Sequence, residues 1–424
     1  MRTAFYNGII LSGKEDMEPV SGKVIVTDGE IISEILDYIP EDCSKFDLKG
    51  KYIMPGLINM HLHIPGSGKP KKKPTDTKKL VKIITSSNAT RKIAESLYKN
   101  YSKTALMSGV TTIRTVGGVD RYDTWMRDRI AEGKYTGPRI LASNMAVSVP
   151  GGHMAGSLAY EATTPDEAAA FVRKIAEDKP DLIKLMITGG VLDAKKLGEP
   201  GELKMKPELV KAACDEAHRL GLPVAAHVES AEGVKVALAN GVDTIEHGAE
   251  PDDEIMELFK SRKAALTCTI TPAVPYALMP IEVSYCREDD KFNGNVVFQG
   301  LISAARRCLA EGVPVGLGND TGCPFVTHYC FWRELHYFAK YCGVSNAFAL
   351  YSATLGNAKI AKIDGITGSI EAGKSADMIV TEKNPLENLE ALRKVDAVVS
   401  RGKVYNNPVV KYMAKVDEEM DKYL

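Results

Sequence analysis

Apolar runs of strand length alternate with helix-like segments through the middle of the chain. Eight such runs have the length and composition of strands. They cover residues 57–63, 109–116, 138–144, 181–187, 223–228, 243–248, 264–270 and 314–320. Strands that alternate with helices favour parallel βα units, so the pattern predicts a (β/α)8 TIM barrel of the α/β class.

Helical periodicity is clearest in three of the intervening segments, which cover residues 206–221, 230–241 and 297–312. The first has Pro207 near its start and Gly221 after its last apolar position. Proline suits the first turn of a helix and glycine the residue after its end, so these two residues predict where this helix begins and ends.

The two ends of the chain have a different pattern, with short β-rich pieces broken by glycine and aspartate. The simplest arrangement is a small β-sandwich formed from both ends, with the barrel inserted between its halves. We therefore expect residues 1–53 to form the first part of the sandwich and residues 54–364 the barrel. Residues 365–424 would form the second part and a C-terminal tail.

Charge and composition narrow the class of partner. The chain has 54 Lys and Arg against 55 Asp and Glu, a net charge of -1, which provides no overall field for nucleic acid or an anionic membrane. A small molecule is the expected partner. No apolar segment reaches about 18 residues, so we expect a soluble, cytoplasmic protein. The basic stretch 69–79 is either a solvated loop or an attractor for an anionic substrate.

Eight cysteines are scattered without a CxxC pair, as expected for reduced thiols in a core. Cys323 follows Asp320 closely and could lie near a site, although a small residue in a loop is the simpler interpretation.

Residues that bind divalent cations end four of the predicted strands. They are His61 and His63, His227, His247, and Asp320. In a strand, residues two apart point to the same side, so His61 and His63 both face the barrel axis. A barrel carries its chemistry at the carboxyl ends of its strands, and the set therefore predicts a metal site.

Lys184 lies in an apolar run that should end at the barrel mouth. An ammonium beside divalent cations would be repelled. It must lose its charge, point away or be chemically modified.

Motifs along nearly the whole chain resemble the amidohydrolase superfamily of metal-dependent amide hydrolases and deaminases. They are PGLINMHLH, TTIRTVGG, GPRILAS with GGHM, IKLMITGG, HVESAEGVKVALANGVDTIEHG, GND and GSIEAGKSADMIV. Within it, the likeness is to the subgroup of prolidase-like Xaa-Pro and Xaa-Arg dipeptidases and ochratoxin-type amidases. The resemblance implies that Lys184 is carbamylated and that its two carbamate oxygens bridge two zinc ions.

The resemblance also implies a ligand for each ion. His61, His63 and Asp320 would hold the more buried ion, and His227 and His247 the more exposed one. Two ions about 3.5–4 Å apart can share a hydroxide that attacks the scissile carbonyl. Asp320 can accept a proton from it and pass the proton to the leaving amine, so we expect Asp320 to be the general acid/base.

His153, in a glycine-rich loop after the third strand, is assigned by the resemblance to the substrate, near its oxyanion or carboxylate. Three positions depart from the family's pattern. Asn59 replaces an aspartate, Thr115 follows Arg114 in place of another aspartate, and Glu229 stands where relatives often have His or Tyr. Glu229 is therefore a further candidate for substrate contact.

The expected function is a binuclear hydrolase of C–N amide bonds, acting on a dipeptide or an N-acyl amino acid. One alternative is a deaminase, or an aryl-amide or cyclic-amide hydrolase, of the same superfamily; another is a scaffold without activity. The aromatic stretch around His328 and His336 has the helical spacing of a packing surface or an oligomer contact, and we expect a homo-oligomer.

Overall fold

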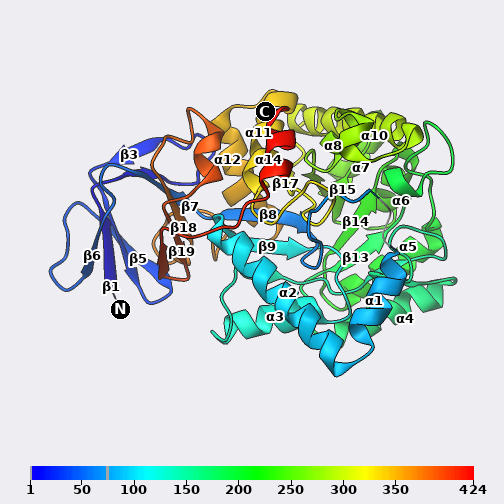
Figure 1. The fold of residues 1–424 in the computed structure, drawn as a ribbon, viewed down its shortest axis with the longest axis horizontal. Coiled ribbons are helices and arrows are strands. Elements are labelled where there is room, and N and C mark those ends of the chain that lie inside the picture. The colour runs from blue at the N-terminus through cyan, green and yellow to red at the C-terminus, as the bar shows by residue number, and fades with distance from the viewer. Residues whose placement is uncertain (1, 73–75) are drawn as a thin grey trace.

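A computed structural model describes residues 2–72 and 76–424, and it consists of a β-rich domain beside a larger barrel (Figure 1). One sheet of the β-rich domain has the order β5-β4-β1-β6 and the other β20-β19-β18-β7-β2-β3. The first comprises β1 Arg2–Tyr6, β4 Val24–Asp28, β5 Ile31–Leu36 and β6 Ser44–Asp47. The second comprises β2 Ile9–Leu11, β3 Pro19–Ser21, β7 Tyr52–Pro55, β18 Met378–Thr381, β19 Ala397–Ser400 and β20 Lys403–Asn406.

Both chain ends contribute to this domain, as the sequence predicts. Strand β7 pairs antiparallel with β18, with Tyr52 opposite Thr381. The two sheets share one buried apolar core, in which Phe5 and Ile25 from the first sheet pack with Ile53 and Met378 from the second. The β-rich domain is therefore a sandwich formed from the two ends of the chain.

The barrel strands follow the eight predicted runs. They are β8 Leu57–Leu62, β9 Val110–Thr115, β10 Arg139–Leu141, β13 Ile183–Met186, β14 Val224–Val228, β15 Thr244–His247, β16 Ala265–Cys268 and β17 Val315–Leu317. The pairs within β8–β10 and within β13–β17 are parallel, and β13 pairs with β11 (Ala146–Ser148) rather than with β10. The amide of Asp320 donates to the carbonyl of His61 at 2.9 Å and closes the ring between the last strand and the first. The predicted (β/α)8 barrel is confirmed.

The third barrel strand is shorter than the sequence suggests. β10 ends at Leu141 because the backbone turns at Asn144, where φ is +59°. The chain then forms β11 Ala146–Ser148, which pairs with β13 on one side and with β12 Ala159–Glu161 on the other. This detour lengthens the connection that carries His153.

Helices surround the barrel. The larger ones are α2 Asn88–Met107, α3 Tyr122–Ala131, α4 Pro165–Ala176, α5 Pro207–Arg219, α6 Ala231–Ala239, α7 Asp253–Arg262, α10 Glu288–Ala310 and α11 Phe331–Cys342. The shorter ones are α1 Thr77–Thr85, α8 Ala273–Ala277, α9 Ile281–Ser284, α12 Asn346–Tyr351, α13 Asn357–Ile360 and α14 Ala414–Asp421. Single turns cover Val191–Asp193, Ser352–Gly356 and Leu389–Arg393.

The three predicted helices are present, but α10 begins nine residues before the expected start at Val297. Its first turn is acidic, and Asp290 pairs with Arg287. Gly294 interrupts the apolar pattern there because a β-carbon at this position would lie 2.4 Å from the side chain of Tyr276. Close packing, rather than a helix boundary, explains this glycine.

The C-terminal tail leaves the sandwich and packs on the barrel (Figure 1). Buried Arg333 of α11 pairs with Asp417 at 2.9 Å and with Asp421 at 2.6 Å, both from α14. The hydroxyl of Tyr337 donates to the carbonyl of Met420 at 3.1 Å. This contact anchors the last helix to the outer ring.

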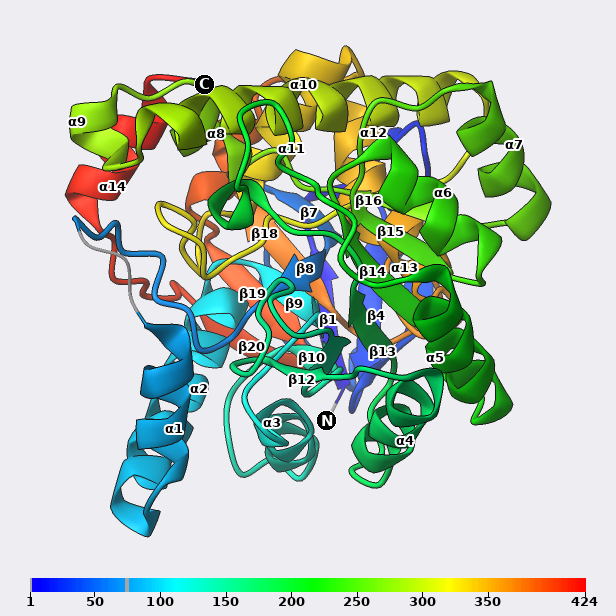
Figure 2. The same ribbon diagram turned by 90° about the vertical axis from the view of Figure 1, so that its right-hand side faces the viewer.

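The helices α1 and α2 project from the barrel (Figure 2). The basic stretch 69–79 leads into α1, and its residues 73–75 lie outside the described part of the chain. His328 is a packing residue: its ring is buried, stacks on Tyr101 and lies 2.8 Å from the carbonyl of Gly66. Among the described residues, no helix is long and apolar enough to cross a membrane.

Candidate metal centre

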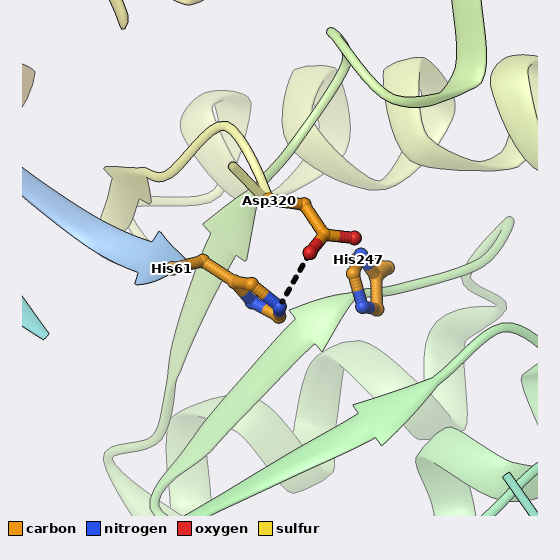
Figure 3. Close-up of side chains that lie close together, drawn as sticks. All are labelled: His61, His247 and Asp320. Atoms are coloured by element: carbon orange, nitrogen blue, oxygen red, sulfur yellow. Dashed lines mark ion pairs between the residues drawn. The ribbon is translucent and has the colours of Figure 1, made fainter. Parts of the chain in front are cut away.

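The six predicted ligand residues come together at the carboxyl ends of the barrel strands. His61 lies in β8 and His63 follows it, Lys184 lies in β13, and His227 and His247 lie in β14 and β15. Asp320 follows β17 at the seam of the barrel, opposite His61 and His247 (Figure 3). All six side chains are buried. The backbones of His247 and Asp320 have φ of +70° and +50°, and non-glycine residues in this strained region cluster at functional sites.

Two overlapping sets of ligand atoms lie at the barrel mouth. One comprises His61, His247 and Asp320, and the other His227, Glu229 and His247; within each set the atoms lie within 4.8 Å of one another. His63 joins the first set, since its Nε2 lies 3.3 Å from Asp320 Oδ1. The shared residue His247 places two candidate cation positions side by side.

Three of the histidines are oriented by acceptors on their Nδ1 atoms. Nδ1 of His61 lies 2.8 Å from Oε2 of Glu246, and Nδ1 of His63 lies 2.7 Å from the carbonyl of Gly117. Nδ1 of His247 lies 2.7 Å from the hydroxyl of Thr269. A proton on each Nδ1 leaves Nε2 as the metal donor, which is the usual arrangement around protein-bound metals. In His227, Nε2 lies 3.2 Å from the carbonyl of Gly189 instead, which leaves Nδ1 as the donor.

The protonation of three of these histidines and of Asp320 suits a cation, whereas, despite its burial, His63 has a pKa raised by the hydrogen bond to Asp320. Burial lowers the pKa of His61 to about 4 and holds the pKa values of His227 and His247 well below the usual one, so these imidazoles are neutral near pH 7. Burial alone would raise the pKa of Asp320, but the surrounding histidines hold it well below its ordinary range. Neutral imidazoles and an ionised carboxylate are the forms that ligate metals.

Two buried polar atoms of the ligand set have no hydrogen-bond partner among the described residues. They are Nζ of Lys184 and Oδ1 of Asp320. Burial is the main cause that lowers the pKa of Lys184, to about 8, with a contribution from Arg114. Leaving a buried polar group unpaired costs about 1–3 kcal/mol, so such atoms call for a ligand. The donor set and these two atoms fit a site for divalent ions.

A second layer of buried charge lies below the ligands. Arg114 donates to Glu246 at 2.6 Å, and its other donors reach Thr244, Thr267 and the carbonyl of Met60. Glu246 in turn orients His61. Glu246 was not among the residues predicted from sequence. The sequence feature that could have indicated it is a lone carboxylate within an apolar strand. A lone cation, Arg114, lies within the second strand and could have been proposed as its partner.

A family model described as the amidohydrolase family matches residues 52–405, which span the barrel and the second part of the sandwich. The chain belongs to the amidohydrolase family. Membership makes the protein a hydrolytic enzyme and agrees with the resemblance seen in its motifs.

Solved structures of similar amidohydrolases cover the whole fold. A proposed prolidase from Bifidobacterium longum is 34% identical, with a TM-score of 0.88, over 100% of this chain and 99% of that one. A Xaa-Pro dipeptidase with methionine bound in its active site is 30% identical, with a TM-score of 0.84, over 96% and 100%. A prolidase complexed with N-methylphosphonate-L-proline is 25% identical, with a TM-score of 0.83, over 96% and 100%.

The chain is also similar to a curated protein with a named activity. Ochratoxinase from Aspergillus niger is 25% identical over 447 aligned residues, covering 96% of this chain and 87% of that protein.

Asn59, where the resemblance leads us to expect an aspartate, is held by hydrogen bonds inside the barrel. Its side-chain amide donates to Oδ1 of Asn319 at 2.7 Å, and its own oxygen accepts from the backbone amides of His61 and Asn319. Asn59 therefore fastens the first strand to the loop that carries Asp320.

His153 reaches the site from the loop after β11. Its ring stacks on His227, with 4.1 Å between ring centroids and 4° between planes, and its Nδ1 lies 2.5 Å from Oδ2 of Asp193. Asp193 was not predicted from sequence, because an aspartate in a glycine-rich loop has no distinctive pattern. Cys323 also lies at the site, where its thiol donates to Oδ2 of Asp320 at 3.3 Å.

Glu229 lies just past β14, beside His227 and His247. Burial raises the pKa of its carboxyl group to about 8, with contributions from the charges of Asp320 and Asp193. Glu229, a candidate for substrate contact from the sequence, thus lies beside the metal-ligating histidines.

Proposed function

We propose that the enzyme is a binuclear metal-dependent hydrolase of an amide bond in a dipeptide or an N-acyl amino acid. His61, His63 and Asp320 hold one ion, and His227 and His247 hold the other. Lys184, carbamylated on Nζ, would be the ligand common to both. Zn²⁺ is the proposed metal, because neutral imidazole nitrogens with carboxylate oxygens are a typical donor set for zinc.

The observation that carries this proposal is that Nζ of Lys184 has no hydrogen-bond partner in the described part of the chain and lies near two ligand sets that share His247. A buried amine without a partner is unfavourable, whereas a carbamate turns it into an anion with two donor oxygens. The shared histidine supports two adjacent ions rather than one.

The protein's own residues supply orientation and proton transfer. When bound, two divalent ions polarise a carbonyl and lower the pKa of water. Oδ1 of Asp320 faces His61 and His63, while its Oδ2 lies beside Cys323. Asp320 takes the proton of the attacking water and passes it to the leaving amine, the role of a general acid/base.

The substrate in this proposal has a free carboxylate on its amine half. Methionine and N-methylphosphonate-L-proline, the ligands named in two similar structures, both carry one. His153 is the proposed partner of this carboxylate, since its ring lies against His227 and its Nδ1 is engaged by Asp193, leaving Nε2 for the substrate.

A hydrolysis screen on zinc-loaded protein tests the proposal. We expect close to two metal equivalents per chain and turnover of dipeptides or N-acyl amino acids. Amidation of the substrate carboxylate should lower kcat/KM roughly ten- to a hundredfold, and His153→Ala should remove that difference. A folded, metal-replete protein with one ion, or equal turnover of carboxylate-free aryl amides, would contradict the proposal.

We also propose that the enzyme acts on its small-molecule substrate as a cytoplasmic homo-oligomer. Sedimentation of the metal-loaded protein measures the oligomeric state.

A further inference from the structure

Glu229 has an unused carboxylate oxygen beside the proposed reaction centre. Its Oε2 is buried and has no hydrogen-bond partner within the described ranges. The backbone amide of Val191 acts on the carboxylate and favours its ionised form, and the amide of Glu229 itself donates to the hydroxyl of Thr188 at 3.0 Å. The side chain is therefore held in place while one oxygen remains available.

Two other carboxylates lie near Glu229. The two side chains that act on it most strongly by charge are Asp320 and Asp193, both carboxylates. Asp320 is assigned to a metal and Asp193 pairs with His153, whereas Glu229, although its ligand atom lies within 4.8 Å of those of His227 and His247, is assigned to no ion in the proposed centre. A buried carboxylate oxygen without a partner is stabilised by a hydrogen-bond donor or a cation placed against it.

The backbone on either side fixes the position of Glu229. A β-carbon at Gly201 would lie 2.3 Å from the backbone of Glu229, so the two segments are in close contact. A β-carbon at Gly190 would lie 3.4 Å from the ring of His153 and 3.5 Å from Oε2 of Glu229. Gly190 thus lies between the proposed carboxylate partner and Glu229.

We propose that Glu229 binds the free α-ammonium group of the substrate residue that precedes the scissile bond. In a dipeptide the α-nitrogen is separated from the scissile carbonyl carbon by one atom, or about 2.5 Å by standard bond geometry. The ligand atoms of Glu229, His227 and His247 lie within 4.8 Å of one another. A carbonyl placed at His227 and His247 brings the ammonium within reach of Glu229.

This inference rests on the proposed function and selects between its two substrate classes. N-acyl amino acids lack the ammonium, whereas dipeptides have it. The subsite therefore makes the enzyme a dipeptidase that requires a free N-terminus.

The test compares substrates that differ only in this group. Alanyl-proline and alanyl-methionine are assayed at pH 7, below the α-amino pKa of about 8, against propionyl-proline and propionyl-methionine. With wild-type enzyme loaded with zinc, we expect kcat/KM to be roughly ten- to a hundredfold higher for the alanyl compounds. Glu229→Gln should reduce this ratio to about threefold or less, because the alanyl compounds lose the contact that the propionyl compounds never make.

Zinc content provides a second readout. Glu229→Gln should keep the wild-type metal content, because Glu229 serves the substrate rather than an ion. Glu202→Gln is the matched control: Glu202 follows Gly201, which lies against the backbone of Glu229, but its own side chain is exposed and pairs with Lys204. It should leave both the substrate ratio and the zinc content unchanged.

Three results would overturn the inference. Equal turnover of alanyl and propionyl compounds by the wild type would refute the subsite and leave the amide hydrolase in place. Loss of one zinc equivalent in Glu229→Gln would make Glu229 a metal ligand instead. No hydrolysis of any of the four compounds by metal-replete wild type would refute this inference together with the proposed dipeptidase function.

Discussion

Two layers of buried charge lie one above the other in the barrel and differ in how their atoms are paired. In the lower layer, the donors of Arg114 and both oxygens of Glu246 have partners. In the upper layer, Nζ of Lys184, Oδ1 of Asp320 and Oε2 of Glu229 have no hydrogen-bond partner among the described residues. We call the lower layer, formed by Arg114 and Glu246 with their partners, the floor. We call the upper layer, formed by the metal-ligating residues and Glu229, the rim.

The difference separates a structural network from a binding site. Buried charges that are fully paired hold neighbouring elements in register, whereas unpaired ones destabilise the protein until a ligand arrives. The floor connects the second, sixth and seventh strands and orients His61 from below. The ligands of the rim are therefore oriented in advance, but the unpaired atoms of the rim destabilise the protein until a ligand binds.

The largest change should follow removal of the lysine from the rim. Lys184→Ala is expected to lose most of its bound metal and nearly all activity, with partial rescue by short carboxylic acids that bridge in place of the carbamate. Metal analysis and turnover with added formate or acetate measure this. Lys211→Ala, which removes an exposed lysine of α5, should change neither. Full metal content in Lys184→Ala would refute the bridging role.

Asp320→Asn should retain the fold but lose about 10² to 10⁴ in kcat, the usual effect of removing a positioned acid/base. The measurement is kcat per bound metal, so that a loss of metal is not mistaken for a loss of proton transfer. Turnover near the wild-type value would remove Asp320 from the proton path.

Breaking the floor should affect stability instead. Arg114→Met leaves Glu246 buried without its cation and should lower the free energy of unfolding by about 3–5 kcal/mol. Urea unfolding of chelator-treated protein measures it. The double variant with Glu246→Leu should recover part of the loss. Arg219→Met breaks an exposed pair with Glu216 and should cost less than about 1 kcal/mol. An equal loss in the free energy of unfolding for Arg114→Met and Arg219→Met would show that the floor pair contributes no more than a surface pair.

The smallest expected effect concerns the support of a single ligand. Thr269→Val keeps the shape of the side chain but removes the hydroxyl that holds Nδ1 of His247. Metal affinity should fall roughly ten- to a hundredfold, as for other residues that orient ligands, with little change in unfolding. Competition with a chelator of known affinity measures this. An unchanged affinity would show that packing alone orients His247.

The sequence by itself determined the architecture and most of the rim. Strand runs that alternate with helices specify parallel βα units, and the carboxyl ends of parallel strands meet at one edge. His61, His63, Lys184, His227, His247 and Asp320 could therefore be placed together without coordinates. The local pattern also located the helix that begins at Pro207.

The tertiary structure decided the pairings between distant residues. Arg114 and Glu246 are 132 residues apart, and His153 and Asp193 lie 40 apart in two different loops. Their contacts depend on barrel register and on where the third strand ends, and the short-range pattern specifies neither. The same reason applies to Glu229: the sequence marked it as a departure, but only the closed barrel brings its carboxylate beside His247.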